Sequence, residues 1–69
     1  MSEYEPYQQR VVEEMVILEE RISKLKSFLD GGMFPSLSYS ERVLLSNQYY
    51  VMGCYLSILQ LRIEGFNQK

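Results

Sequence analysis

Residues 43–61 read VLLSNQYYVMGCYLSILQL, a run of nineteen positions without a charged side chain in a chain that is 23% charged. Such a run either crosses a membrane or is covered by other parts of a protein. Its length is close to that of a membrane span. However, polar side chains interrupt it, at Ser46, Asn47, Gln48, Ser57 and Gln60. We therefore expect this stretch to pack against protein, and we expect no association with a membrane.

The same stretch carries the repeat of a helix that packs along one seam. Apolar residues recur at alternating spacings of three and four, as they do where two helices pack lengthwise. On this half of the chain they are Leu45, Tyr49, Met52, Leu56, Leu59, Ile63 and Phe66. The first half has a matching seam at Val11, Met15, Leu18, Ile22, Leu25 and Leu29. Two seams of equal length predict two helices, at about residues 5–30 and about residues 39–64.

A turn is expected at residues 31–38. Two glycines and Pro35 disfavour helix there, and Ser38 or Ser40 can cap the helix that follows. Ser38 followed three residues later by Glu41 has the spacing of a helix-starting capping box. A short connection places consecutive helices antiparallel. The sequence therefore predicts an all-α fold, an antiparallel two-helix hairpin that forms a single domain over residues 1–69.

Each helix carries further apolar residues outside its seam. They are Val12, Val16 and Ile17 on the first helix and Leu44, Val51, Tyr55 and Ile58 on the second. A two-helix hairpin cannot cover two faces of each helix, and a chain of 69 residues buries only a small core. Cys54 is the only cysteine, so no disulfide within the chain can add stability. We expect the hairpins to assemble into a helical homo-oligomer. Cys54 lies in the middle of the apolar second helix and is expected to be a small buried residue.

The composition disfavours several classes of function. The sequence has no histidine and no glycine-rich phosphate loop, so we expect no catalytic residue, no metal site and no cofactor. A net charge of −2 and a pI near 5.0 disfavour a partner such as long nucleic acid. The N-terminus does not resemble a signal peptide, and one cysteine fits a reducing compartment. A cytoplasmic protein is the expectation.

The start of the first helix holds residue types that suit nucleotide binding. Tyr4 and Tyr7 lie beside Gln8, Gln9 and Arg10. A flat ring can stack on a base, amides can bond base edges, and arginine can bind phosphate. A helix N-terminus also favours an anion. The alternative is that Tyr7 packs as the outermost residue of the seam, four positions before the first apolar residue.

Most of the chain resembles a family of small phage proteins. The resemblance rests on YQQRVVEE at 7–14, LEERISKLKSFL at 18–29, MFPSL at 33–37 and LSILQLRI at 56–63. These segments are similar to the hairpin proteins that act as anti-CBASS and anti-Thoeris sponges, many of them described only as crAssphage-related hypothetical proteins. The resemblance implies a homo-oligomer, with hexamers in the family, that works in the host cytoplasm. It also implies binding of cyclic di- or trinucleotides or cyclic ADP-ribose signals between protomers, without cleavage.

The resemblance also suggests roles for particular residues. Tyr7 matches the tyrosine that stacks on a base and Arg10 matches a phosphate ligand, with Gln8 as a base-edge donor. The phosphate lysine of the family could correspond to Lys24 or to Lys26. Lys26 adjoins the seam residue Leu25 and lies closer to an interface, so it is the candidate, whereas Lys24 is expected to face solvent. Two further cations are candidates: Arg42 at the start of the second helix, and Arg62, which antiparallel pairing places opposite Tyr7 so that Tyr7, Arg10 and Arg62 would form one cluster.

Two other functions remain open at this point. A structural or adaptor hairpin would bind a host or phage protein through its acidic outer face and would need no small ligand. A small helical transcription regulator is the third hypothesis, although the acidic balance and the missing basic recognition helix count against it.

Overall fold

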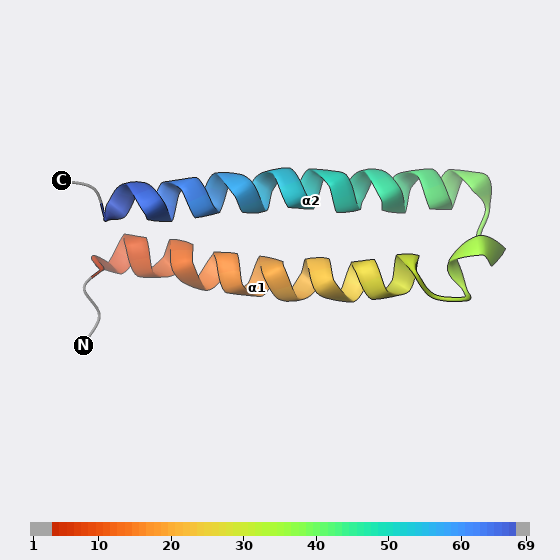
Figure 1. Cartoon of the computed structure of the whole chain (residues 1–69), viewed down its shortest axis with the longest axis horizontal. Coiled ribbons are helices and arrows are strands. Elements are labelled where there is room, and N and C mark those ends of the chain that lie inside the picture. Colours follow the sequence, from red (N-terminus) through yellow and green to blue (C-terminus); the bar gives the residue numbers. More distant parts are fainter. Residues whose placement is uncertain (1–3, 68–69) are drawn as a thin grey trace.

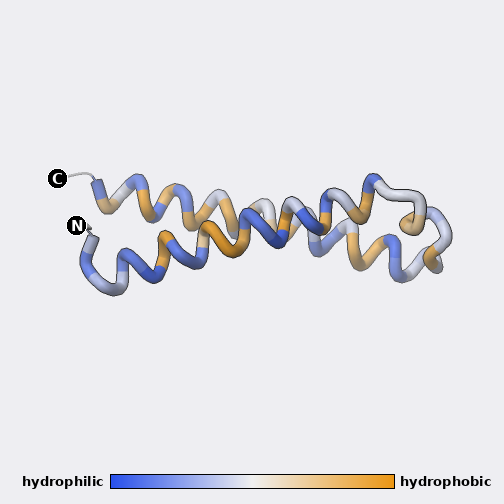
Figure 2. Tube along the Cα trace, turned by 90° about the horizontal axis from the view of Figure 1, so that it is seen from below, coloured by the Kyte–Doolittle hydropathy of each residue, from blue (hydrophilic) through white to orange (hydrophobic). Residues whose placement is uncertain are grey.

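The computed structural model describes residues 4–67, which form two long helices joined by a short turn. Helix α1 spans Pro6–Leu29, a single 3-10 turn, η1, spans Phe34–Ser36, and helix α2 spans Tyr39–Phe66. The two long helices run antiparallel, side by side (Figure 1), and cross at a shallow angle when seen from below (Figure 2). The hairpin measures 49 × 19 × 15 Å. The all-α fold with two helices is confirmed, and residues 4–67 contain no strand.

The helix starts are set by local hydrogen bonds. Glu5 is the residue before α1, and its backbone N–H donates to Gln8 Oε1 at 2.8 Å. Ser38 is the residue before α2, and there the bond runs the other way: the Ser38 hydroxyl accepts from the backbone N–H of Glu41 at 3.2 Å. These side chains satisfy polar groups that the first turn of a helix leaves unpaired. The predicted cap at Ser38 is therefore confirmed, while α2 continues to Phe66, two residues beyond the expected end near residue 64.

The core lies along the predicted seam. Val11, Leu18 and Leu59 are buried, and Leu59 has no exposed surface. Further seam residues pack around them while staying half-buried: Met15, Ile22, Met52, Leu56, Ile63 and Phe66. The alternating spacing thus located the contact between α1 and α2 correctly. Among residues 4–67, however, Val11, Leu18 and Leu59 are the only buried ones.

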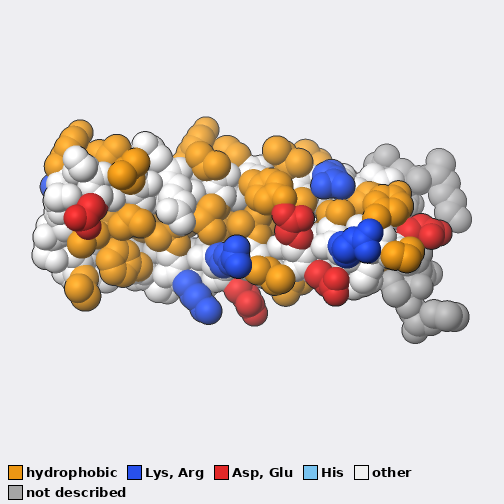
Figure 3. Space-filling model, turned by 180° about the vertical axis from the view of Figure 1, so that it is seen from behind, with side chains coloured by type: hydrophobic (Ala, Val, Ile, Leu, Met, Phe, Trp, Pro, Cys, Tyr) orange, Lys and Arg blue, Asp and Glu red, His pale blue; other side chains and the backbone are white. Residues whose placement is uncertain are grey.

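A second apolar stripe lies open on the hairpin. On α2 the exposed fractions are 67% for Leu44, 61% for Val51 and 53% for Ile58, and on α1 they are 47% for Val16 and 49% for Ile17. Figure 3 shows hydrophobic side chains along the length of one face of the molecule. The prediction that a single hairpin leaves this stripe uncovered agrees with the structure.

Cys54 is exposed, so the prediction that it is buried is wrong for the single hairpin. Cys54 lies between the seam residues Met52 and Leu56, two positions from each. Positions two apart on a helix face different sides, and Cys54 consequently points away from α1.

Residues 4–67 contain neither a membrane-spanning helix nor a metal-binding group of side chains. Within residues 4–67, neither long helix has a stretch both long and apolar enough to span a membrane. The same part of the chain holds no group of three or more histidine, cysteine or acidic side chains placed to bind a metal ion.

Candidate functional site

An aromatic cluster forms at the open end of the hairpin, where α1 begins and α2 ends. The Tyr7 ring lies 5.9 Å from the Phe66 ring between centroids, with the planes at 78°. Tyr4 contacts the same Phe66 ring at 6.2 Å and 67°. Both are edge-to-face contacts, a favourable arrangement of aromatic rings. Tyr7 nevertheless stays 53% exposed, so it packs against α2 and still offers ring surface to a ligand.

Gln8 supports this cluster from within α1. Its side-chain oxygen accepts the backbone N–H of Glu5, and its amide nitrogen lies 3.4 Å from the Tyr7 hydroxyl. The sequence predicted a base-edge donor here. In the structure Gln8 starts the helix and touches Tyr7, so its oxygen is already engaged.

The two arginines predicted near Tyr7 are both exposed. Arg10 follows Tyr7 by three residues and therefore lies on the same side of α1. Arg62 precedes Phe66 by four residues on α2. The hydrogen bond to Glu14 raises the pKa of Tyr55, and the positive charge of Arg62 opposes that shift. Both cations thus belong to the open-end half of the hairpin.

Lys26 lies in a different place. Its ammonium forms an ion pair with the Asp30 carboxylate at 3.1 Å, and both side chains are mostly exposed. The hydrogen bond to Asp30 and its negative charge raise the pKa of Lys26 above the usual value for lysine. Nineteen residues separate Lys26 from Tyr7 along α1, which is about 28 Å at 1.5 Å per residue. One small ligand cannot reach both residues of the same chain.

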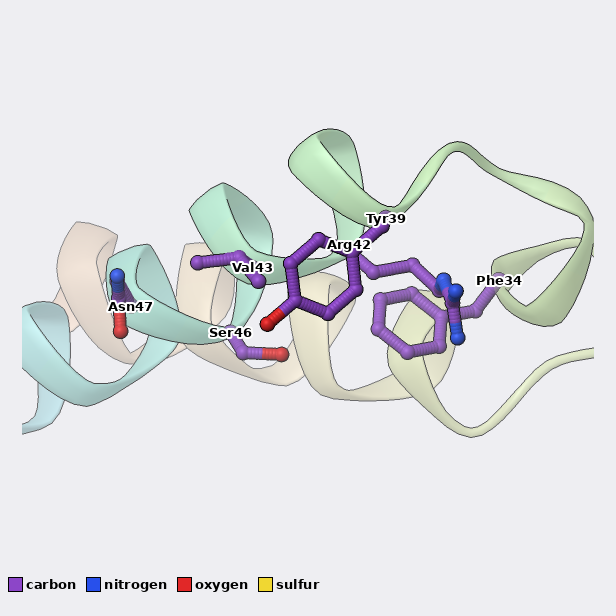
Figure 4. A pocket seen from close by; sticks show the side chains of 6 residues that line it. All are labelled: Phe34, Tyr39, Arg42, Val43, Ser46 and Asn47. Atoms are coloured by element: carbon purple, nitrogen blue, oxygen red, sulfur yellow. The ribbon is translucent and has the colours of Figure 1, made fainter.

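Arg42 occupies a second cluster, beside the turn. It lines an open hollow of about 340 Å³ together with Phe34, Tyr39, Val43, Ser46 and Asn47. Figure 4 shows the Phe34 and Tyr39 rings and the Arg42 side chain converging at one end of the hollow, with Ser46 and Asn47 farther along α2. The Arg42 guanidinium lies 6.0 Å from the centre of the Tyr39 ring, and its Nε is shielded from solvent without an acceptor.

Phe34 and Tyr39 were not among the predicted site residues. The spacing of three between Tyr39 and Arg42 is a detectable signal, since residues three apart on a helix are neighbours. Phe34 could not be placed from the sequence, because its position depends on the 3-10 turn over Phe34–Ser36.

The fold and its two clusters define a class: a small antiparallel helical hairpin that presents aromatic rings and cations at both of its ends. Comparison with known proteins identifies the family. The sequence model of the Sequestin family matches residues 5–65, and the chain belongs to this family.

A phage protein is among its relatives. Over 60 residues the chain is 38% identical to an uncharacterized 7.5 kDa protein from the denB-rIIB intergenic region of enterobacteria phage T4, an alignment that covers 87% of this chain and 94% of the relative. The expected similarity to small phage proteins is confirmed by this relative. No solved structure matches the chain.

Proposed function

We propose that the chain is a phage immune-evasion protein that sequesters cyclic nucleotide immune signals in the host cytoplasm. The family description, Sequestin, supports sequestration, and the T4 relative supports a phage setting. The observation that carries the ligand class is the Tyr7 ring, which is held by Phe66 and yet more than half exposed.

The held ring suits base stacking. Stacking of a base on an aromatic side chain contributes about 1–3 kcal/mol. A ring already fixed by its neighbours loses little conformational freedom on binding, so more of that energy appears as affinity. Tyr7 is fixed by the Phe66 ring and by the nearby Gln8 amide. Arg10 on the same side of α1 supplies a fork of N–H donors for a phosphate group.

In this proposal the ligand is held and not cleaved. The sequence has no histidine, the side chain that most often transfers protons in catalysis. Inhibition would then be stoichiometric, because each occupied site removes one signal molecule from the host effector.

Assembly completes the proposed site. The exposed stripe that includes Leu44, Val51 and Ile58 favours contact with further copies of the chain. Burying a large apolar side chain stabilises a protein by about 1.5–3 kcal/mol, and a side chain left in water does not contribute this free energy. We propose a homo-oligomer, with six copies as the family resemblance suggests and cyclic nucleotides bound between protomers.

A binding experiment tests the ligand class. Equilibrium dialysis would use cyclic dinucleotides, cyclic trinucleotides and cyclic ADP-ribose isomers with the parent protein and with Tyr7→Ala, Tyr7→Phe and Arg10→Ala. We expect Tyr7→Ala to weaken binding by roughly 5- to 150-fold, the equivalent of one lost stacking contact. Tyr7→Phe keeps the ring and should bind nearly as well as the parent, and the ligand should be recovered intact. Unchanged binding by both alanine variants would show that this cluster is not the site.

An adaptor function is the second candidate, because α1 presents adjacent exposed acidic residues. They are Glu13, Glu14, Glu19 and Glu20. A host protein that co-purifies with the parent but not with a Glu19→Lys, Glu20→Lys double variant, combined with no binding across the nucleotide panel, would favour the adaptor.

A further inference from the structure

The hollow beside the turn contains a cation without an acidic partner. Within residues 4–67 the ion pair formed is that of Lys26 with Asp30, and no carboxylate lies within 4.0 Å of the Arg42 guanidinium. Arg42 Nε is shielded from solvent and has no acceptor. A shielded N–H without an acceptor is unfavourable, and an anion held against the part of the guanidinium that lines the hollow would offset part of that cost through its charge.

The walls of the hollow suit a planar group next to that anion. Phe34 comes from η1 and Tyr39 from the first turn of α2, and both rings line the same space as the guanidinium. Tyr39 is 75% exposed, which leaves most of its ring surface open. Farther along α2, Ser46 and Asn47 add a hydroxyl and an amide (Figure 4). Ring faces, a guanidinium and an amide are together the groups that bind a base and a phosphate.

The hollow is small. Its volume of about 340 Å³ is at the lower end of the range of ligand pockets, which is roughly 300–1,000 Å³. A ligand with one base and one phosphate therefore suits it better than a cyclic dinucleotide or trinucleotide.

The hollow is also remote from the open end of the same hairpin. Arg42 and Phe66, the partner of Tyr7, are both on α2 and are separated by twenty-four residues, or about 36 Å. A single nucleotide cannot span that distance. Binding at the two ends of one chain would therefore be two separate events.

We propose that the hollow lined by Phe34, Tyr39 and Arg42 is a second ligand site, separate from the cluster at Tyr7, and that it binds a nucleoside monophosphate. The phosphate lies against the Arg42 guanidinium, and the base lies against the aromatic rings. This site does not depend on the function proposed for the open end, because it uses none of the same residues.

The experiment observes Arg42 directly. In nitrogen-15-labelled protein, the Arg42 Nε–H signal is assigned by its disappearance in Arg42→Lys and is then followed during titrations with 5′-AMP, adenosine and inorganic phosphate. We expect 5′-AMP to shift this signal to saturation in the parent and equally in Tyr7→Ala. Adenosine and phosphate, which each lack half of the ligand, should bind at least tenfold more weakly than 5′-AMP.

Variants distinguish a binding site from a structural contact. Arg42→Gln and Phe34→Leu should each weaken 5′-AMP binding at least tenfold, as measured by calorimetry. Arg21→Gln is the matched control, since Arg21 is an exposed arginine of α1 that does not line this hollow. The Arg21→Gln variant should bind 5′-AMP with the affinity of the parent. Circular dichroism checks that each variant is folded. If Arg42→Gln does not fold, the titration of the parent protein still decides the question.

Two results would overturn the proposal. An Arg42 signal that stays fixed with 5′-AMP at millimolar concentration would mean that the hollow binds no mononucleotide. A shift that is present in the parent and absent in Tyr7→Ala would mean that the two ends form one composite site between chains. If Tyr7→Ala loses cyclic nucleotide binding but still binds 5′-AMP, the result concerns the open end only. The two proposals can therefore fail independently of each other.

Discussion

The Tyr55 hydroxyl on α2 donates a hydrogen bond to the Glu14 carboxylate on α1, joining residues that are 41 positions apart in the sequence. Hydrogen bonds to a charged acceptor are stronger than those between neutral groups. The contact lies outside the apolar seam. Apolar packing has no preferred direction, so this hydrogen bond is a directional link between α1 and α2 in addition to the packing.

This link should make stability depend on alkaline pH. The hydrogen bond to Glu14, followed by burial and the negative charge of Glu14, raises the pKa of Tyr55 above its usual value near 10. A raised pKa in the folded state means that the neutral phenol is favoured by folding. The stabilisation that the Tyr55 phenol contributes is fully present below the pKa that Tyr55 has in the unfolded chain. It is lost as pH rises through the pKa that Tyr55 has in the folded chain.

Urea unfolding between about pH 8 and about pH 11 would measure this effect. We expect the parent to lose more stability over this range than Tyr55→Phe, which lacks the hydroxyl. Tyr50→Phe is the control, because Tyr50 is 71% exposed and should leave the pH dependence of the parent unchanged. Parallel curves for the parent and Tyr55→Phe would contradict the assignment.

The second prediction concerns the centre of the core. Leu59 is the only residue among those described with no exposed surface. Its replacement by alanine should cost about 2–5 kcal/mol, a large part of the 5–15 kcal/mol that typically stabilises a protein. We therefore expect Leu59→Ala to lose much of its helical circular dichroism at 25 °C, while the neighbouring exposed substitution Gln60→Ala keeps it. Equal thermal midpoints for these two variants would argue against the seam as the stabilising core.

Self-association is the third prediction. Ile58 is 53% exposed on the open apolar stripe of α2, and a carboxylate at that position would be costly to bury between chains. We expect sedimentation equilibrium to show an oligomer for the parent and a monomer of reduced helicity for Ile58→Glu. Lys24→Glu, on the exposed side of α1, should assemble like the parent. A monomeric parent with full helicity at micromolar concentration would contradict assembly through the stripe.

The sequence predicted the packing of this fold well because apolar spacing determines which face of a helix is covered. Leu18 and Leu59 lie where the seam predicted, and the Ser38 cap follows directly from a local hydrogen-bonding pattern. Cys54 was misplaced because an apolar neighbourhood in sequence was taken as burial in space. Two positions along a helix are enough to turn a side chain from one face to another.

The candidate sites were less predictable, since they depend on contacts between distant segments. Arg42 was selected by residue type, but Phe34, which lines the same hollow, comes from the turn. The contact between Tyr7 and Phe66 agrees with the alternative that Tyr7 packs as the outermost residue of the seam. The engagement of Gln8 with Glu5 could have been anticipated from their spacing of three, which is that of a capping box. Charge alone could not show that Lys26 pairs with Asp30.

Native mass spectrometry tests the central claim of sequestration most directly. The parent and Tyr7→Ala would be measured with and without a mixture of cyclic dinucleotides, cyclic trinucleotides and cyclic ADP-ribose isomers. We expect the parent to appear as an oligomer that gains intact ligand mass in whole-number steps, and Tyr7→Ala to form the same oligomer with little or no ligand. A parent oligomer that stays free of ligand across the whole panel would contradict sequestration of these signals and would favour the adaptor function.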